Sequence, residues 1–383
     1  MARRTPSLRS LAIAGAFVAA GAAAAIPPAP VPVPRTDFGP FEYVCRRSAG
    51  PIIVDGRLDE ASWADADWTE VFGDIEGPSK PEPRFRTRAQ MLWDDQCLYI
   101  GAYLEEPHVW ATLTARDSII FQDNDFEVFI DPDGDTHAYY ELEMNALNTV
   151  WDLLLVKPYR DGGPAVHAWD IQGLRTGVQV MGTLNDPSDR DKAWTVEIAL
   201  PFAVLKECIP GKPERPAAGD QWRVNFSRVE YRVNVENGTY VKVRDAATGQ
   251  PAPEDNWTWT PQGVVNIHYP EMWGFVQFSS KLPGKGKERF DRGADEKVKW
   301  ALRRIYYAQR ARYLEKAAFA ADLAALGLED DGTLRIKGWS YPPVIQVTAS
   351  QFEAVYASKA GGSWHIRQDG LVWKETPARA AAK

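Results

Sequence analysis

The stretch NDFEVFIDPDGDTHAYYELEMNALNTVWDLLLV, residues 124–156, decides the fold. Its first apolar run, residues 126–130, stops at Asp131-Pro132-Asp133-Gly134, a sequence typical of a turn. In the second run, apolar residues at 140, 142 and 144 alternate with polar residues, which is the period of a strand with one buried face. A third run follows at 151–156. Three strands joined by polar turns predict an antiparallel sheet.

The same pattern recurs on both sides of this stretch, between residues 41 and 280. Runs at 91–93 and 97–104 flank a polar turn, which is typical of a hairpin. Residues 194–200 alternate again, and further strand-like runs lie at 222–231 and 276–278. Eight or more strands with few helical signals predict a mainly β fold, an antiparallel β-sandwich or jelly roll.

The pattern changes after a Gly- and Lys-rich linker at residues 281–294. From Asp295 to about Leu326, apolar residues recur at helical spacing, and Gly327 is a suitable C-cap. Short strand-like runs follow at 334–337, 344–348 and 352–356, and the run 364–373 is broken by an Asp-Gly turn. Residues 295–383 therefore predict a small α+β unit, a long helix plus short strands, that leans on the sandwich.

The first residues predict export. Arginines at 3, 4 and 9 precede an Ala-rich apolar run ending at residue 25, the pattern of a secretory signal peptide over residues 1–25. The run is short for a transmembrane helix, so we expect no membrane span after cleavage. The expected location is outside the cell, in the periplasm or in the cell envelope. Five prolines favour a stiff linker over residues 26–40.

Composition narrows the possible partners. The net charge of −8 argues against nucleic acid, because phosphate binding needs clustered Lys and Arg. Aromatic residues are numerous, with 15 Trp, 14 Tyr and 15 Phe. Trp either packs in a core or stacks on sugar rings at a surface, and composition leaves both open.

The chain has three cysteines, Cys45, Cys97 and Cys208. Because this number is odd, at least one cysteine is unpaired within the chain.

Six short blocks, taken in order, resemble one known family. They read IVDGRLDEASW from Ile53, LWDDQCLYI from Leu92, NDFEVFIDP from Asn124, WTVEIALP from Trp194, WTPQG from Trp259 and PEMWG from Pro270. Over residues 41–280 they resemble carbohydrate-binding module family 9 (CBM9) and its stand-alone secreted relatives. The resemblance implies a distorted jelly roll that binds oligosaccharide or polysaccharide and supports polysaccharide catabolism. The C-terminal unit lies outside it.

The resemblance also implies a site. Xylanase-linked members hold one sugar between two aromatic rings, with polar side chains at its hydroxyls and structural calcium nearby. Phe121 matches one ring position and Trp259 the other, with Trp257 as its nearest substitute. Glu127 and Asn145 match polar positions. Glu143 stands where those members carry an arginine that contacts sugar, so an acceptor replaces a group with five donors.

The residues themselves offer support and alternatives. Trp257 and Trp259 are two apart and face one side of a strand, and flanking prolines favour a loop. If their strands are neighbours, Glu127, Glu143 and Asn145 line one concave surface. Core packing is the alternative for the aromatic residues, Phe121 included, and a solvated strand face is the alternative for the polar ones.

A metal site is expected after the 126–130 run. Asp131, Asp133 and Asp135 are spaced oxygen ligands of the kind that suits Ca²⁺, and the resemblance implies structural calcium as well. A simple polar turn is the alternative.

Catalysis has little support in the sequence. No nucleophile elbow, HExxH motif or phosphate loop occurs, and the five His residues are scattered. With 52 Asp and Glu residues, the carboxylate pair of a glycosidase stays open. We expect binding without catalysis, in a family often attached to glycoside hydrolases. Two other classes stay open: a haem-binding redox sandwich, with Met144 or Met181 and His137 as ligands, and an envelope protein that binds a protein partner.

Overall fold

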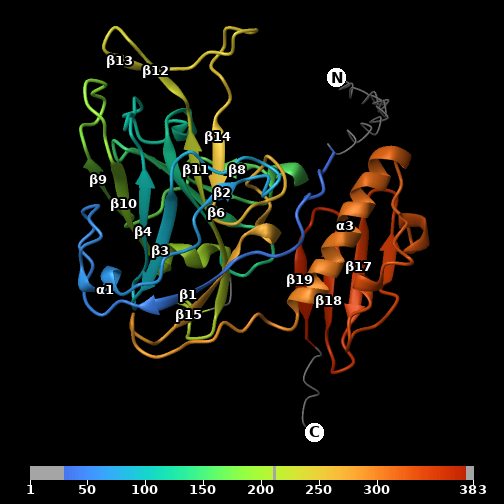
Figure 1. Cartoon of the computed structure of the whole chain (residues 1–383). Helices are drawn as coiled ribbons and strands as arrows, with labels where there is room; N and C mark the ends of the chain where they lie inside the picture. Colours follow the sequence, from blue (N-terminus) through green and yellow to red (C-terminus); the bar gives the residue numbers. More distant parts are fainter. Residues whose placement is uncertain (1–29, 210–212, 377–383) are drawn as a thin grey trace, which may run out of the picture.

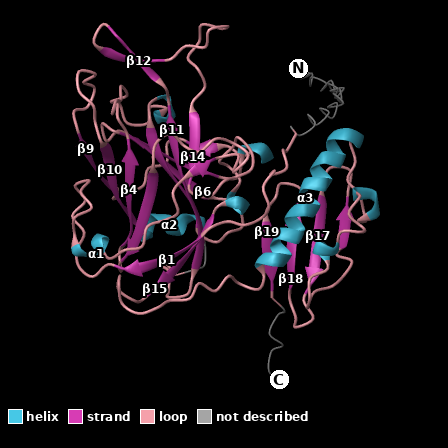
Figure 2. Cartoon of the chain, viewed as in Figure 1, coloured by secondary structure: helices cyan, strands magenta, loops and turns pink. Residues whose placement is uncertain are grey.

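The computed structural model describes residues 30–209 and 213–376 (Figure 1). A large curled β structure is followed by a smaller unit in which one long helix lies on a four-stranded sheet (Figure 2). The predicted mainly β fold with a small C-terminal α+β unit is confirmed. The predicted signal peptide at residues 1–25 lies outside the described residues.

The strands and helices of the first part alternate with loops of varied length. They are β1 Glu42–Arg47, α1 Ala61–Ala64, β2 Gly73–Asp74, β3 Thr87–Trp93, β4 Cys97–Glu105, the 3₁₀ turn η1 Ile120–Gln122, β5 Asp125–Asp131, β6 Tyr139–Asn145, β7 Val150–Leu155, β8 Ala165–Val166, β9 Arg175–Met181, β10 Ala193–Pro201, α2 Phe202–Leu205, β11 Gln221–Glu230, β12 Val233–Glu236, β13 Thr239–Lys242, β14 Asp255–Thr258, the 3₁₀ turn η4 Pro270–Met272 and β15 Gly274–Ser279.

Two layers enclose the main core. The hydrogen-bonded order is β8-β7-β6-β5-β11-β15-β1-β3-β4-β10-β9, so β15 and β1 join a layer containing β5–β8 and β11 to one containing β3, β4, β9 and β10. Phe126, Leu142 and Val196 are among the buried residues between these layers. Unlike the other pairings along this order, those of β1 with β15 and with β3 are parallel. No hairpin links β1 to either neighbour, so nothing forces it to run antiparallel.

The alternation in residues 124–156 produces the predicted meander. β5 pairs antiparallel with β6, and β6 with β7. Phe126, Val128 and Ile130 face the main core. Phe129 lies on the opposite, outer face and packs in a second apolar cluster with Tyr139, Trp151 and Trp273. The outer face of β5 and β6 is therefore covered as well.

The block that begins at Ile53 has a structural role. The Asp55 and Gly56 amides donate to Glu197 Oε2 at 3.0 and 3.2 Å, and Trp63 Nε1 donates to Glu197 Oε1 at 2.8 Å. Gly56 has a φ of +88°, and a Cβ there would lie 2.4 Å from the Val178 carbonyl carbon. Only glycine fits this approach, so the block fastens its loop onto β9 and β10.

The C-terminal unit contains α3 Glu296–Lys316 and the strands β16 Val344–Val347, β17 Phe352–Ala357, β18 Ser363–Arg367 and β19 Val372–Glu375. Its helix ends ten residues before the predicted end, because Ala317 takes a left-handed conformation and its amide bonds to the Tyr313 carbonyl at 2.8 Å. Gly327 instead follows a short 3₁₀ turn, and residues 334–337 form no strand. The Asp-Gly turn does connect β18 to β19.

A polar cluster fastens α3 to the sandwich. Arg160 Nη2 contacts both Glu271 carboxylate oxygens at 2.8 Å, and Tyr306 Oη donates to Asp161 Oδ1 at 2.6 Å. Tyr307 donates to Glu271, and Arg310 pairs with Asp161. We call Arg160, Asp161, Glu271 and Arg310 the interface cluster.

The Pro-rich segment also packs. Phe38 stacks on Trp300 of α3 with ring centroids 4.3 Å apart, and Tyr269 donates to the Pro32 carbonyl at 2.9 Å. The chain from residue 31 onward thus lies against the folded part, where the sequence predicts a stiff spacer.

Two further observations bear on the expectations. Cys45, Cys97 and Cys208 are all buried, and none forms a disulfide. Among the described residues, no helix has both the length and the apolar character needed to span a bilayer.

Candidate functional site

Trp259 does not present a ring at an open groove. The residue has no exposed surface, and its ring packs against Phe226 at 5.9 Å and Tyr43 at 6.4 Å. Its Nε1 donates to Glu70 Oε2 at 2.9 Å. A Cβ on Gly274 would lie 2.4 Å from the ring. The expectation of a stacking platform at Trp259 is therefore wrong, because both ring faces already have protein partners.

Trp257 is also part of the core. It is 3% exposed, and β14 places it directly opposite Arg228 on β11. The guanidinium groups of Arg228 and Arg84 lie 5.2 and 5.5 Å from its ring centre, and Phe85 meets it edge-on. The flanking prolines that favoured a loop bound a short paired strand instead. The predicted surface role of Trp257 is therefore wrong too.

Phe121 is where the prediction places it, at the surface. It belongs to η1, directly before β5, and is 40% exposed. Its amide donates to Glu143 Oε2 at 2.9 Å, and its ring lies 6.4 Å from that of Trp151. Phe121 thus offers an exposed apolar ring beside the carboxylates of β5 and β6.

Those carboxylates do share one face. β5 and β6 are neighbours, with Glu127 opposite Glu143 and Asp125 opposite Asn145. Glu141 follows on the same face. The predicted grouping of Glu127, Glu143 and Asn145 is confirmed, but all of them are buried rather than open. We call Asp125, Glu127, Glu141 and Glu143 the acidic cluster.

Asn145 cannot read a sugar hydroxyl in this arrangement. Its amide nitrogen donates to the Leu113 carbonyl at 2.8 Å and to Asp123 at 3.0 Å. Its oxygen accepts from the Leu147 and Thr149 amides. All four of its hydrogen-bonding positions are used, so Asn145 holds the β6–β7 turn and the segment before η1.

The acidic cluster is electrostatically unusual. Burial raises the pKa of Glu127 to about 7, and burial together with Glu127 raises the pKa of Glu141 to about 8. Burial and the neighbouring carboxylates also raise the pKa values of Asp125 and Glu143 well above their ordinary range. Four desolvated carboxyls so close together favour the neutral form of one another.

Two aromatic side chains adjoin this cluster that the sequence does not single out. Tyr159 is 45% exposed, and it contacts His268, which lies against Phe129 on the outer face of β5. Its ring meets His268 edge-on at 4.7 Å. Trp151 on β7 stacks with the exposed His167 at 5.7 Å. The alternation in β6 could have indicated Glu141, whereas Tyr159 lies in a loop that has no such signal.

The predicted calcium ligands also come together. Oxygens of Asp131, Asp133 and Asp135 lie within 4.8 Å of one another. Asp131 accepts the Gly134 and Thr136 amides at 2.9 Å each, so it also shapes the turn. A carboxylate oxygen that accepts one amide keeps a second lone pair, and three carboxylates are a donor set that suits Ca²⁺. The residues therefore fit both a turn and a cation site.

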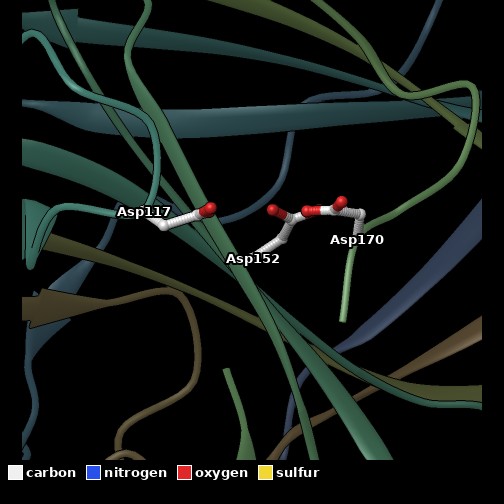
Figure 3. A group of neighbouring side chains, drawn as sticks. All are labelled: Asp117, Asp152 and Asp170. Atoms are coloured by element: carbon white, nitrogen blue, oxygen red, sulfur yellow. The ribbon is translucent and has the colours of Figure 1, made fainter. Parts of the chain in front are cut away.

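A further acidic group lies at β7, formed by Asp117, Asp152 and Asp170 (Figure 3). Arg116 pairs with all three carboxylates. Asp152 is fully buried and also accepts the Ile171 amide at 2.6 Å. A guanidinium thus supplies the positive charge at this group.

The residues named for haem do not meet. Met144 lies in the main core near the end of β6, whereas His137 precedes that strand and contacts the Asp369 carbonyl at 3.0 Å. At about 3.3 Å per residue along a strand, the seven positions between them span roughly 20 Å. Met181 belongs to β9 in the other layer. No pair among these three forms the ligand set of one iron.

A second surface feature lies on the opposite layer. Leu58, Trp68, Tyr103 and Met181 line a pocket of about 450 Å³. The Arg88 guanidinium covers Trp68 at 3.9 Å from the ring centre. This pocket combines an aromatic ring with polar groups and is a rival location for a ligand.

Comparison with solved structures returns carbohydrate-binding proteins at low identity. A carbohydrate-binding module family 9 from Caldicellulosiruptor kristjanssonii, solved with cellotriose and with glucose, is 15% identical in both cases. Each match covers 65% of this chain and 100% of that chain, with TM-scores of 0.40 and 0.39. A putative carbohydrate-binding protein from Bacteroides uniformis is 13% identical over 63% of this chain and 100% of that chain, with a TM-score of 0.45.

No curated protein matches the chain. The family profile described as "Carbohydrate family 9 binding domain-like" matches residues 54–279, which is more than half of the chain and spans most strands of the sandwich. The chain belongs to the carbohydrate family 9 binding domain-like family.

Proposed function

We propose that this protein binds an oligosaccharide or polysaccharide at the outer face of β5 and β6, without catalysing a reaction. The observation that carries the proposal is the placement of two exposed rings, Phe121 and Tyr159, beside the buried carboxyls of Glu141 and Glu143. Sugar rings present C–H groups that pack on aromatic faces, and their hydroxyls bond to carboxyl oxygens. Membership in the family supports the same ligand class.

The acidic cluster suits hydroxyl recognition for a second reason. Glu141 Oε2 is buried and makes no hydrogen bond within the described chain. A buried acceptor without a partner costs about 1–3 kcal/mol, which a ligand hydroxyl recovers by donating to it.

The test is a calorimetric titration of the full chain with cello-oligosaccharides and with xylo-oligosaccharides. Phe121→Ala and Tyr159→Ala are each expected to weaken binding about ten-fold, because each removes one stacking face. Trp68→Ala, on the opposite layer, is the matched control and is expected to bind as the parent does. Loss of binding in Trp68→Ala with unchanged binding in the other two variants would move the site to the rival pocket.

We also propose that the protein acts outside the cytoplasm, in polysaccharide catabolism, after removal of residues 1–25. The charged and apolar pattern of these residues supports export. Fractionation of cells expressing the full chain, with N-terminal sequencing of the mature protein, is expected to find it outside the cytoplasm with an N-terminus near residue 26. Full-length protein in the cytoplasm would contradict this.

The calcium expectation at Asp131, Asp133 and Asp135 remains part of the proposal. Its support is the donor set and the mutual proximity of the three carboxylates. Asp133→Asn is expected to lower the calcium stoichiometry of the full chain by one, measured by calorimetry after chelator treatment. An unchanged stoichiometry would leave these residues as a turn.

A further inference from the structure

Within the described chain, several buried carboxylates are paired with an arginine, whereas the four of the acidic cluster are not. Arg228 pairs with Glu106 and Glu230, Arg160 with Glu271, and Arg116 with Asp152. Within residues 30–209 and 213–376, no Lys or Arg forms an ion pair with a member of the acidic cluster. A group of buried carboxylates without a positive partner is strongly unfavourable when ionised.

The oxygens of the cluster converge. One carboxylate oxygen each from Asp125, Glu127 and Glu143 lies within 4.8 Å of the others. Ca²⁺ holds oxygen ligands at 2.3–2.6 Å, so two ligands of one ion are separated by at most about 5 Å. Three oxygens at this spacing can surround a single ion without movement of the backbone.

Unused acceptors point to the same place. Asp125 is fully buried, and its Oδ2 has no hydrogen-bond partner, although its Oδ1 accepts the Val229 amide at 3.1 Å. Glu141 is 5% exposed, and its Oε2 likewise has no partner. Asp125 belongs to the group of three whose oxygens converge, and Glu141 lies on the same face of β6 as Glu143.

We propose that Asp125, Glu127 and Glu143 bind one divalent cation with oxygen-preferring chemistry, such as Ca²⁺, with Glu141 as a fourth carboxylate beside it. The ion supplies the positive charge that arginine supplies in the other buried acidic groups. It also gives Glu143 a second function, because the same side chain accepts the Phe121 amide and so links the ion to the exposed ring. This site is separate from the three aspartates at 131–135.

Calcium alone is the probe, so the result does not depend on any sugar. The full chain is freed of metal with a chelator and titrated with Ca²⁺, and then with Mg²⁺ and Mn²⁺, by calorimetry. The parent is expected to bind Ca²⁺ at this site, and Glu127→Gln/Glu143→Gln is expected to bind one ion fewer. Each lost carboxylate weakens an oxygen site, so at least a hundred-fold loss in affinity is expected for the double variant. Asp131→Asn, which alters the other acidic group, is expected to retain the ion at Asp125.

Equal stoichiometry and affinity in the parent and the double variant would overturn the proposal, as would a parent that binds no divalent cation at millimolar concentration. If the double variant does not fold, Glu141→Gln takes its place. It removes one buried charge beside the ion and is expected to weaken calcium binding several-fold, and an unchanged affinity overturns the proposal equally.

The ion also bears on the proposed sugar site, a part of the inference that rests on the proposed function. Sugar affinity is expected to fall at least ten-fold in chelator and to recover with Ca²⁺ in the parent. If the sugar affinity is the same with and without chelator, only the link between the ion and the sugar site is overturned. Calcium binding without sugar binding overturns the proposed function alone.

Discussion

The interface cluster and the acidic cluster both bury carboxyl groups, but the pKa values of these groups shift in opposite directions. Burial alone would raise the pKa of Glu271, but Arg160 and Arg303 lower it to about 2. At the outer face, burial and like charges raise the pKa of Glu141 to about 8. The first cluster fastens the C-terminal unit to the sandwich, and the second has no such fastening role. Charge balance therefore separates a structural group from the group for which we propose a ligand.

The strongest test of this comparison removes the arginine from the balanced side. Arg160→Met leaves Glu271 buried and without its bidentate partner, which is expected to cost about 3–5 kcal/mol of unfolding free energy. Urea unfolding followed by tryptophan fluorescence measures the change. Lys281→Ala is the control, because its pair with the partly exposed Glu288 is expected to contribute less than about 1 kcal/mol. Equal losses in both variants would remove the distinction between the buried and exposed pairs.

A smaller effect is expected from acid. Because the folded protein holds Glu271 ionised down to about pH 2, whereas the unfolded chain protonates it near pH 4.5, stability falls as the pH drops between these values. This contribution is expected to be roughly 2–3 kcal/mol. Glu271→Gln should flatten that part of the profile, as measured by urea midpoints from pH 5 to pH 2. If the variant loses as much stability as the parent between pH 5 and pH 2, Glu271 is not the group responsible.

The acidic cluster is expected to show a pH dependence of the opposite sign. The unfolded chain ionises Glu141 near pH 4.5 and the folded protein only near pH 8, so without divalent cations stability falls as the pH rises across this window. Relative to the parent, Glu141→Gln is expected to be more stable at pH 8 and equally stable at pH 4. Thermal melts in chelator test this. A variant that is less stable than the parent at pH 8 would contradict the repulsion assigned to the cluster.

The strands and their faces were predictable because alternation is a local property. Residues 124–156 form the predicted meander, and neighbouring strands bring Glu127 beside Glu143. Local pattern also indicates the Asp-Gly turn near the C-terminus. The predicted helix is too long because Ala and Leu residues continue beyond Lys316. The structure ends it at the left-handed Ala317, after which Phe319 packs against Tyr313 and Phe352.

The site was harder to predict because burial depends on distant segments. Trp259 looked exposed from its neighbouring prolines, yet it fills space left by Gly274 and packs beside Phe226. The sequence predicts an open surface at the outer face of β5 and β6, yet part of that face packs in the cluster containing Ile120 and Trp273. The position of Tyr159 at this face could not be predicted, because no sequence pattern near residue 159 relates it to β6.

The pairing of β1 with β15 has a consequence for how the protein folds. Tyr43 lies opposite Val276, so the first strand finds its partner only after more than two hundred further residues have been made. Such long-range closure is slow, because loop entropy must be overcome before the contact forms. A nascent chain still lacking β15 therefore has an incomplete core, and the sandwich closes only after residue 279 has been made.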